Sequence, residues 1–391
     1  MRLHFLNDRE RQGTREFYES AFPEDSKEFV DFYYDWIVKQ NDIFAAGQWE
    51  GNAYKIQAMM HINRHNFLIN GFHRSAPYLV AVATRPECRK QGKMRCMMEQ
   101  ALQDLCRRQY PFAFLMPANP AYYTSLGFRY FPNQPGLWKS NAQPGSWKPN
   151  AQPGLWKSNA QPAVKLPDIQ HSLLQGISWR QPRPQDIPQM CAFANQILGQ
   201  SYQIAIQWEK AYCKRLFAET AAEQGGVLLL ESSDTLQGIL VYGISTENIE
   251  NKEKKTAEIK DLILDGRLIL GLQGQKEGVA AGVVKRHIQE SLCHIALPEY
   301  AIAFPPMEMM LRILCISAFV PLLKNPACQT LYVDIEDPVI SSNCGCFELI
   351  LSPDGNRINR TQRTGNEQKM DIAELAQFLL KDIPVYITEW V

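Results

Sequence analysis

The sequence predicts a mixed α/β (α+β) protein of two or three domains. Helix-like and strand-like patterns alternate through about the first 130 residues, three near-identical nine-residue units then interrupt them, and mixed segments resume near residues 177 and 307. The length of 391 residues suits two or three domains at about 150 residues each. Apolar residues make up 45% of the chain and charged residues 21%, which is enough apolar material for hydrophobic cores.

The first segment begins with a short strand and two amphipathic helices, at Arg2–Leu6, Glu10–Phe22 and Ser26–Val38. Strand-like runs follow at Ile43–Trp49, Tyr54–Asn63, Tyr78–Thr84 and Phe112–Met116, with a helix between the last two that ends near Arg108. The almost wholly apolar run Tyr78–Thr84 is typical of a central strand buried on both faces. Asn119 and Pro120 favour the start of a short helix, because they suit the N-cap and the first helical position.

Residues 134–160 contain three copies of a unit that begins Gln-Pro-Gly and contains a tryptophan. The Pro-Gly pair in each copy and the absence of helix or strand periodicity predict a turn-rich linker, which we place at 134–162. Three such short units cannot build a solenoid core. The alternative is a peptide-recognition segment that uses Trp138, Trp147 and Trp156 as anchors.

The later segments contain further helices and strands. Helices are predicted at 184–198, 208–223, 310–323 (as far as Pro321) and 371–380, and strands at 226–230, 238–245, 329–335 and 346–351. Residues 352–356 predict a hairpin turn, and Asp371 is a candidate helix N-cap. The chain ends in an apolar, β-prone run at 384–391, which argues against a frayed terminus.

Charge and cysteine content exclude several classes of protein. With 41 basic and 41 acidic residues the formal net charge is zero, so the basic excess of a general nucleic-acid or anionic-membrane binder is absent. No apolar run approaches 18 residues, and the N-terminus has no signal-peptide pattern. The ten cysteines form no CxxC motif, and His and Cys show no metal-ligand spacing. We therefore expect a cytoplasmic protein with reduced thiols and no metal.

The run Tyr78–Met98 carries the strongest chemical signal. A buried strand enters a basic loop that contains Gly92, and the loop enters a helix. The free N–H groups at a helix start and the helix dipole favour an anion such as a pyrophosphate, and glycine lets the backbone approach it closely. Taken alone, this pattern also fits an ordinary strand–turn–helix unit with a basic turn.

A second element, AYYTSLGF at 121–128, follows the next buried strand. Together the two resemble the GNAT superfamily of N-acetyltransferases over residues 1–130. The whole chain, apart from the repeats, resembles the Eis (enhanced intracellular survival) acetyltransferases. This wider likeness rests on VATRPECRKQGKMR (82–95), AYYTSLGF, MLRILCISAFVPLL (310–323) and LYVDIEDPVISSNCGCFELIL (331–351). It implies a GNAT domain at 1–133, a second GNAT-like domain without a CoA motif at 163–303, and a sterol-carrier-protein-like domain at 304–391.

The resemblance also implies a site. Acetyl-CoA would contact Val82, Ala83, Thr84, Lys90, Gln91, Gly92, Lys93, Met94, Arg95, Ala118 and Asn119. The general acid would be Tyr123 and the general base the terminal carboxylate, here that of Val391. Family members acetylate aminoglycosides and other amines and form hexamers, so a small-molecule amine acceptor and a homo-oligomer are expected. Met94 departs from the Gly or Ala that is frequent at its position, so either its side chain points away from the phosphates or the loop is slightly wider.

The chemistry agrees with these roles. A carboxylate can take the proton of the amine, and a phenol can protonate the departing thiolate. A cationic acceptor favours a binding site lined by acidic side chains, and Glu24, Asp25 and Glu389 are candidates. Of the two neighbouring tyrosines, Tyr122 rather than Tyr123 is expected in the hydrophobic core. Two alternatives stay open: a non-catalytic binder of lipids or other apolar ligands on a degenerate GNAT scaffold, and a protein or peptide N-acetyltransferase.

Overall fold

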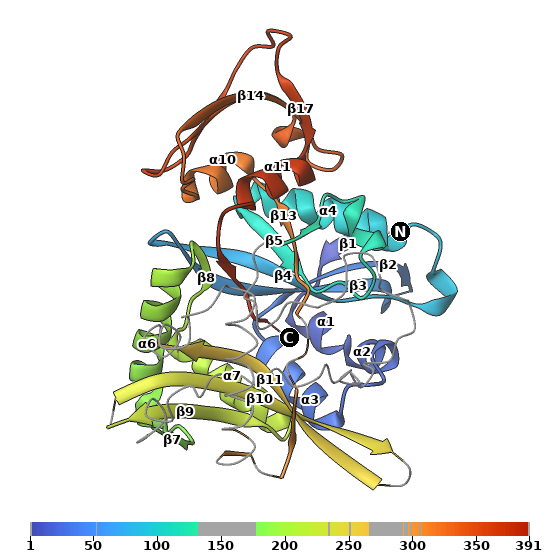
Figure 1. Cartoon of the computed structure of the whole chain (residues 1–391). Helices are drawn as coiled ribbons and strands as arrows, with labels where there is room; N and C mark the ends of the chain where they lie inside the picture. The colour runs from blue at the N-terminus through green and yellow to red at the C-terminus, as the bar shows by residue number, and fades with distance from the viewer. Residues whose placement is uncertain are drawn as a thin grey trace. The chain divides into compact units, whose positions relative to one another are not determined.

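The computed structural model describes residues 2–51, 53–131, 177–233, 235–249, 252–265, 299–303 and 307–389, together with residues 292, 296, 297 and 305 (Figure 1). The tryptophan repeats and the linker predicted at 134–162 lie outside these residues. The chain forms two compact units: residues 1–135, 185–226 and 308–391 make up the first, and residues 136–184 and 227–307 the second. The two units interleave along the chain, whereas the predicted domains follow one another in sequence.

A nine-stranded sheet, built from described residues, forms the centre of the first unit. Its order is β1-β2-β3-β4-β5-β13-β6, with β8 added to β3 and β18 added to β8. The strands are β1 (Arg2–Phe5), β2 (Asp42–Glu50), β3 (Ala53–Ile69), β4 (Phe72–Thr84), β5 (Phe112–Leu115), β6 (Arg129–Tyr130), β8 (Ile204–Ile206), β13 (Met310–Ile313) and β18 (Val385–Tyr386). β1 to β4 pair antiparallel, whereas β4 and β5 run parallel.

Helices cover both faces of this sheet. Alternate residues of a strand point to opposite faces, so Phe44 of β2 joins the core cluster of α4, and Ile43 joins that of α2 and α3. The helices of the N-terminal part are α1 (Asp8–Gln12), α2 (Arg15–Ala21), α3 (Lys27–Phe32), a π-helical turn at Tyr33–Ile37, α4 (Lys93–Arg107) and α5 (Ala121–Thr124). Two more belong to the same unit, α6 (Ile187–Ser201) and α7 (Lys210–Ala222). The single helix predicted at Glu10–Phe22 is therefore two short helices.

The segment Met310–Leu323 begins with a strand, so the prediction of a helix there was wrong. β13 pairs with β5 on one side and with β6 on the other, and all four of its residues are buried. A continuous apolar run suits a strand buried on both faces as well as a buried helix, so periodicity alone does not separate them. Only the short helix α10 (Ile316–Phe319) follows, with a 3-10 turn at Val320–Leu322.

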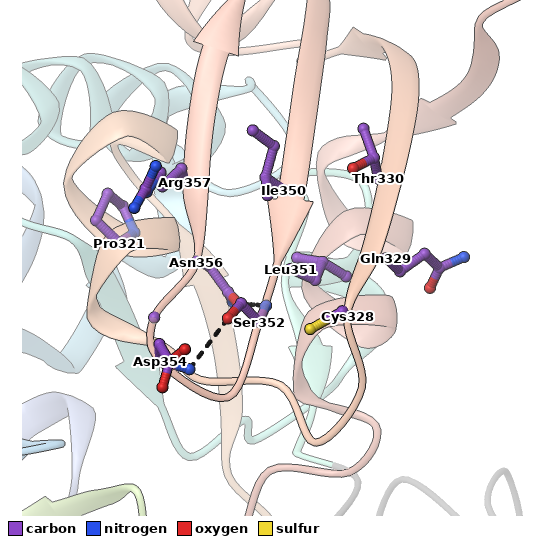
Figure 2. A pocket seen from close by; sticks show the side chains of 11 residues that line it. Pro321, Cys328, Gln329, Thr330, Ile350, Leu351, Ser352, Asp354, Asn356 and Arg357 are labelled. Carbon is purple, nitrogen blue, oxygen red and sulfur yellow. Dashed lines mark hydrogen bonds between the residues drawn. The ribbon is translucent and has the colours of Figure 1, made fainter.

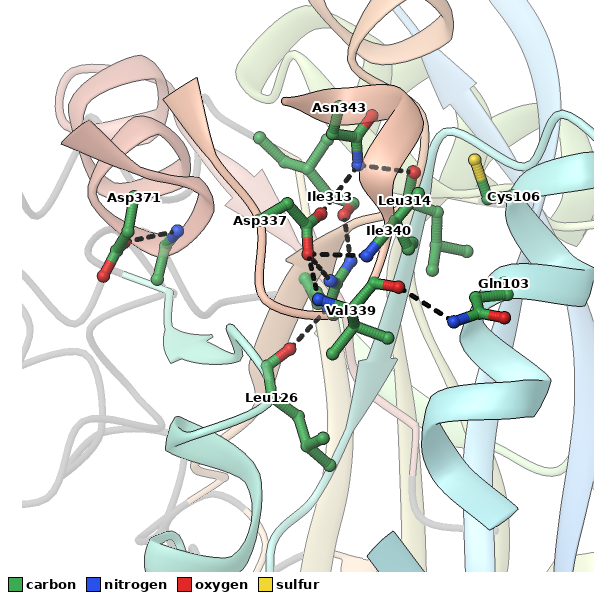
Figure 3. Close-up of polar contacts among 12 residues, drawn as sticks. Gln103, Cys106, Leu126, Ile313, Leu314, Asp337, Val339, Ile340, Asn343 and Asp371 are labelled. Atoms are coloured by element: carbon green, nitrogen blue, oxygen red, sulfur yellow. Dashed lines mark hydrogen bonds and ion pairs between the residues drawn. The ribbon is translucent and has the colours of Figure 1, made fainter. Parts of the chain in front are cut away.

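Arg312 connects β13 to the C-terminal part of the first unit. Its side chain is fully buried, and its Nη2 donates a hydrogen bond of 2.5 Å to Oδ1 of Asp337. Its Nε and Nη1 donate to the carbonyl oxygens of Leu126 and Ile313. Asn343 donates to the other carboxylate oxygen of Asp337 (Figure 3). A buried charge needs such partners, because an unpaired one is strongly destabilising.

The C-terminal part contains a second, smaller sheet. Its order is β16-β15-β14-β17, from β16 (Arg357–Arg360), β15 (Gly345–Leu351), β14 (Gln329–Glu336) and β17 (Gln368–Asp371). Asp371 and Glu374 form a capping box at the start of α11 (Ile372–Leu380), which confirms the predicted N-cap. The chain then continues into β18 beside β8, so the C-terminal residues rejoin the large sheet (Figure 1).

The second unit contains a five-stranded sheet of order β12-β11-β10-β9-β7 among its described residues. These strands are β7 (Ile177–Arg180), β9 (Gly226–Ser232), β10 (Thr235–Ile249), β11 (Lys252–Leu264) and β12 (Ala301–Ala303). β10 and β11 form a long antiparallel hairpin.

In the described parts of the chain, no helix is long and apolar enough to cross a membrane.

Candidate active site

Strands β4 and β5 form the centre of the candidate site. Within the described residues their parallel ladder consists of the pair Tyr78 and Phe114, whose rings stack with centroids 5.0 Å apart. Just beyond this pair, Ala81 has a φ of 50° and the β3–β4 register shifts, which marks a β-bulge. The bulge turns the end of β4 where its ladder with β5 has stopped. Val82, Ala83 and Thr84, the predicted contacts along this strand, lie in this stretch.

The predicted pyrophosphate site lies in the loop between β4 and α4 and in the first turn of α4. Gly92 is the N-cap of the helix, with a left-handed φ of 73°, and a Cβ at this position would have no neighbour within 4 Å. Lys90, Gln91 and Gly92 are exposed, whereas Met94 packs against the core cluster of α4. Lys93 begins the helix and Arg95 pairs with Glu99 at 2.8 Å. The first turn thus presents free N–H groups beside basic side chains, and Met94 points into the core.

Tyr123 lies on the short helix α5, which follows β5. It is only 6% exposed, and its ring contacts Phe128 edge-on, whereas Tyr122 is 59% exposed. The prediction that Tyr122 is the core residue was therefore wrong: with a helical turn of four residues, the neighbour that faces the sheet is Tyr123. Burial raises the pKa of Tyr123 to about 12, so its phenol stays protonated at neutral pH. Ala118 is exposed, and Asn119 accepts a hydrogen bond of 3.0 Å from the N–H of Ala121 at the start of α5.

The C-terminal segment reaches the same sheet. β18 pairs with β8, and three residues after its end the side chain of Glu389 is buried between Arg215 of α7 and His65 of β3. His65 in turn contacts the rings of Tyr78 and Phe114 edge-on, with centroids 6.0 and 5.9 Å away. The described chain therefore ends beside the point where β4 and β5 stop pairing. Val391, the predicted base, lies outside the described residues.

The other two acidic candidates lie between α2 and α3. Glu24 is exposed, and Asp25 is half-buried and accepts a 2.7 Å hydrogen bond from the hydroxyl of Tyr18. Burial raises the pKa of Asp25. Tyr18 stacks on Tyr33 with centroids 5.2 Å apart, and both rings are buried in the core cluster of α2 and α3. The half-buried carboxylate of Asp25, rather than the ring faces, is therefore the group that can meet a cation.

A cavity of about 620 Å³ lies elsewhere, at one end of the small C-terminal sheet (Figure 2). Its lining comes from α10–β14 and the β15–β16 turn: Pro321, Cys328, Gln329, Thr330, Ile350, Leu351, Ser352, Asp354, Gly355, Asn356 and Arg357. The lining therefore mixes apolar side chains with polar and charged ones. In the described residues no group of three or more His, Cys, Asp or Glu side chains is placed to hold a metal ion.

Sequence reasoning did not single out His65 or Arg215. One signal was present: His61, Asn63 and His65 occur at every second position, which places them on one face of a strand. All three are buried, so that face is covered rather than exposed. The position of Arg215 had no such signal, because its partner Glu389 lies 174 residues away in the sequence.

Comparison with known proteins supports the GNAT assignment. Residues 2–131 match the family described as "Acetyltransferase (GNAT) domain". No curated protein matches the sequence. A GCN5-related N-acetyltransferase from Anabaena variabilis shares the fold with a TM-score of 0.64 and 13% identity, over 97% of this chain and 90% of that one.

Two other solved structures resemble the chain over nearly its full length. A GCN5-related N-acetyltransferase from Kribbella flavida has a TM-score of 0.62 and 13% identity, over 100% of this chain and 98% of that one. Eis1 from Mycobacterium abscessus has a TM-score of 0.57 and 12% identity, over 97% and 90%. The predicted mixed α/β GNAT fold is confirmed, and residues 2–131 form an acetyltransferase domain of the GNAT type. The sterol-carrier-like assignment of the last segment stays a prediction.

Proposed function

We propose that this chain transfers the acetyl group of acetyl-CoA to a primary amine of a small molecule. The observation that carries the proposal is the end of the β4–β5 ladder at Tyr78 and Phe114, directly followed by the Gly92 loop and the start of α4. The pantetheine arm would lie along Val82–Thr84, and the pyrophosphate would bind the N–H groups and basic side chains of residues 90–95. Ala118 and Asn119 would border the arm on the side of β5.

The chemistry requires a base and an acid. Amines are mostly protonated at neutral pH, so a base must remove a proton before the nitrogen attacks the thioester carbon. By the resemblance we assign this role to the terminal carboxylate of Val391. Tyr123 would give its proton to the departing thiolate of CoA, for which a protonated phenol at neutral pH is suited.

Cationic acceptors such as aminoglycosides or polyamines are the proposed substrate class. The half-buried carboxylate of Asp25 supports this choice, because a carboxylate attracts an ammonium group. Glu24 and Glu389 were predicted for the same role; Glu24 is exposed, whereas Glu389 is already paired with Arg215. By the resemblance we also propose that the protein is cytoplasmic and forms a homo-oligomer. Light scattering of the purified protein tests the oligomeric state.

Release of free CoA thiol during incubation with acetyl-CoA and a panel of amines tests the proposal. The panel contains an aminoglycoside, a polyamine, a peptide with a free N-terminus, and no amine at all. We expect thiol release and an acetylated product with the aminoglycoside or the polyamine. Thiol release with the peptide but with no other amine would indicate a peptide N-acetyltransferase instead. The absence of thiol release with every amine would reject acetyl transfer.

A further inference from the structure

We propose that Arg215 and His65 bind the carboxylate of Glu389 and so hold the C-terminal segment, residues 384–391, beside the acetyl-transfer site. We call these three residues the anchor. In a chain that ends at Val391, this segment carries the terminal carboxylate. The proposal assigns positioning roles to three residues, and it rests on the proposed function only for its effect on the reaction.

The contacts of Glu389 are those of a fixed side chain. Glu389 is 2% exposed, and Nη2 of Arg215 donates to its two carboxylate oxygens over 3.0 and 2.9 Å. Nδ1 of His65 lies 3.1 Å from Oε2 of the same carboxylate. A buried carboxylate is costly unless it is paired and hydrogen-bonded, so these contacts hold Glu389 in one place.

The chain is also held a few residues earlier. Val385 and Tyr386 pair with β8, and the carbonyl oxygen of Pro384 accepts a hydrogen bond from the N–H of Gln203. The segment is therefore fixed at two points, residues 384–386 and residue 389. An extended chain advances about 3.3 Å per residue, so a residue two positions after Glu389 is within about 7 Å of the anchor along the backbone.

The anchor lies at the point that the reaction would use. His65 packs edge-on against Tyr78 and Phe114, the pair at which the β4–β5 ladder ends. Burial, with the charge of Arg215 as a second cause, keeps the pKa of His65 well below its usual value, so the ring is neutral. A neutral ring that donates from Nδ1 to Glu389 has a lone pair on Nε2, and this atom has no hydrogen-bond partner within the described residues.

The pairing of Glu389 distinguishes a positioning role of this residue from a role in binding the acceptor amine. Both carboxylate oxygens of Glu389 already accept hydrogen bonds from Arg215, whose charge also interacts with Glu219 of α7, so Glu389 itself has no unpaired oxygen to offer to an ammonium group. If Glu389 bound the acceptor, its loss would raise the KM for the amine. If it positions the C-terminal segment, its loss lowers kcat and leaves the KM for the amine and the affinity for CoA unchanged.

Carboxypeptidase digestion of the full 391-residue chain, followed by intact mass, tests the anchor without any activity measurement. We expect the native protein to lose at most its last two residues, 391 and 390. Arg215→Met and Glu389→Gln should lose residues through Thr388 and Ile387 toward β18, and Arg215→Lys, which keeps the charge, should be intermediate. Arg180→Met is the matched control, because it breaks the Arg180–Glu231 pair of the second unit. End points equal to those of the native protein in both Arg215→Met and Glu389→Gln would overturn the anchor.

Steady-state kinetics then tests its effect on the reaction. Arg215→Met and Glu389→Gln should lower kcat at least tenfold with unchanged KM for the amine, and Arg215→Lys should recover part of the loss. A raised KM for the amine with unchanged kcat would instead make Glu389 an acceptor-binding residue. If the digestion end points shift as expected but the native protein acetylates no amine, the anchor stands and the proposed function fails.

Discussion

At the residue scale, burial sets the protonation state of Tyr123, the proposed general acid. Its ring lies in the core cluster of α4, and within the described residues its hydroxyl donates no hydrogen bond to the protein. Burial disfavours the phenolate and raises the pKa to about 12. The phenol therefore carries its proton at neutral pH, as the proposed donor to a departing thiolate must.

Tyr123→Phe should lower kcat by about 10²- to 10⁴-fold, the usual contribution of a general acid, and leave CoA affinity unchanged. The phenylalanine ring fills the same space, so packing survives while the proton donor is lost. Because the pKa of Tyr123 is about 12, the native enzyme should show no loss of activity from this group between pH 7 and 10; its proton is lost only as the pH rises toward 12. Kinetics across this pH range, beside calorimetric titration with CoA, measures both effects. An unchanged kcat would make Tyr123 a core aromatic only.

At the scale of elements, the C-terminal segment and the α4 loop are fixed by different means. The segment is held by strand pairing and by the ion pair of Glu389, so its position depends on residues distant in the sequence. The loop is held by its own backbone: Lys90 and Gly92 both have left-handed φ values, of 59° and 73°. The terminal carboxylate, a backbone group, would thus be positioned by tertiary contacts, and the anion site by local geometry.

Val391→Ala should keep most activity, because the carboxylate proposed as the base belongs to the backbone. A C-terminal peptide tag should lower kcat strongly, since it replaces this carboxylate with a neutral amide and moves the charge away. Deletion of Val391 should act like the tag, because it withdraws the carboxylate by about 3.3 Å. Acetylation rates of the three variants and the native chain are compared at saturating substrates. Full activity of the tagged protein would exclude the terminal carboxylate as the base.

At the scale of the whole molecule, β13 integrates the C-terminal part into the N-terminal sheet. It supplies the strand between β5 and β6, and Arg312 within it binds Asp337 in the connection between β14 and β15 of the small sheet. Gln103 of α4 also donates to the carbonyl oxygen of Val339. The acetyltransferase domain and the C-terminal residues of the first unit therefore share one core.

Arg312→Leu should destabilise the protein by about 3–5 kcal/mol, because it leaves Asp337 buried without its ionic partner. The double variant Arg312→Leu/Asp337→Leu should recover part of this loss, since it removes the uncompensated charge. Urea unfolding followed by fluorescence and circular dichroism gives both free energies. Arg108→Leu, which breaks the more exposed pair with Asp42, should cost about 1 kcal/mol or less and serves as control. An equal cost for Arg108→Leu and Arg312→Leu would contradict the role of the buried pair.

The sequence predicted those parts of the fold that depend on neighbouring residues. The N-cap at Asp371, the glycine at the start of α4 and the apolar strands β4 and β5 are local patterns, and each was predicted. Long-range pairing was not predictable in the same way. An apolar run such as Met310–Ile313 does not show which strands it lies between, and no spacing rule joins Arg215 to Glu389. Residues that bind acetyl-CoA through a loop can thus be proposed from sequence, whereas residues that position the C-terminal segment need the structure.

The central claim is that acetyl-CoA binds at the end of β4 with its pyrophosphate on the Gly92 loop, and two matched glycines test it. Gly92 and Gly71 are both exposed, both have left-handed φ values (73° and 85°), and a Cβ at either position meets no atom within 4 Å. Gly92→Glu and Gly71→Glu therefore impose similar backbone strain, but only Gly92→Glu places a negative charge in the proposed site. Calorimetric titration should give the same CoA affinity for the native protein and Gly71→Glu, and at least a hundredfold weaker binding for Gly92→Glu. Native-like affinity in Gly92→Glu, or no CoA binding by the native protein, would contradict the account.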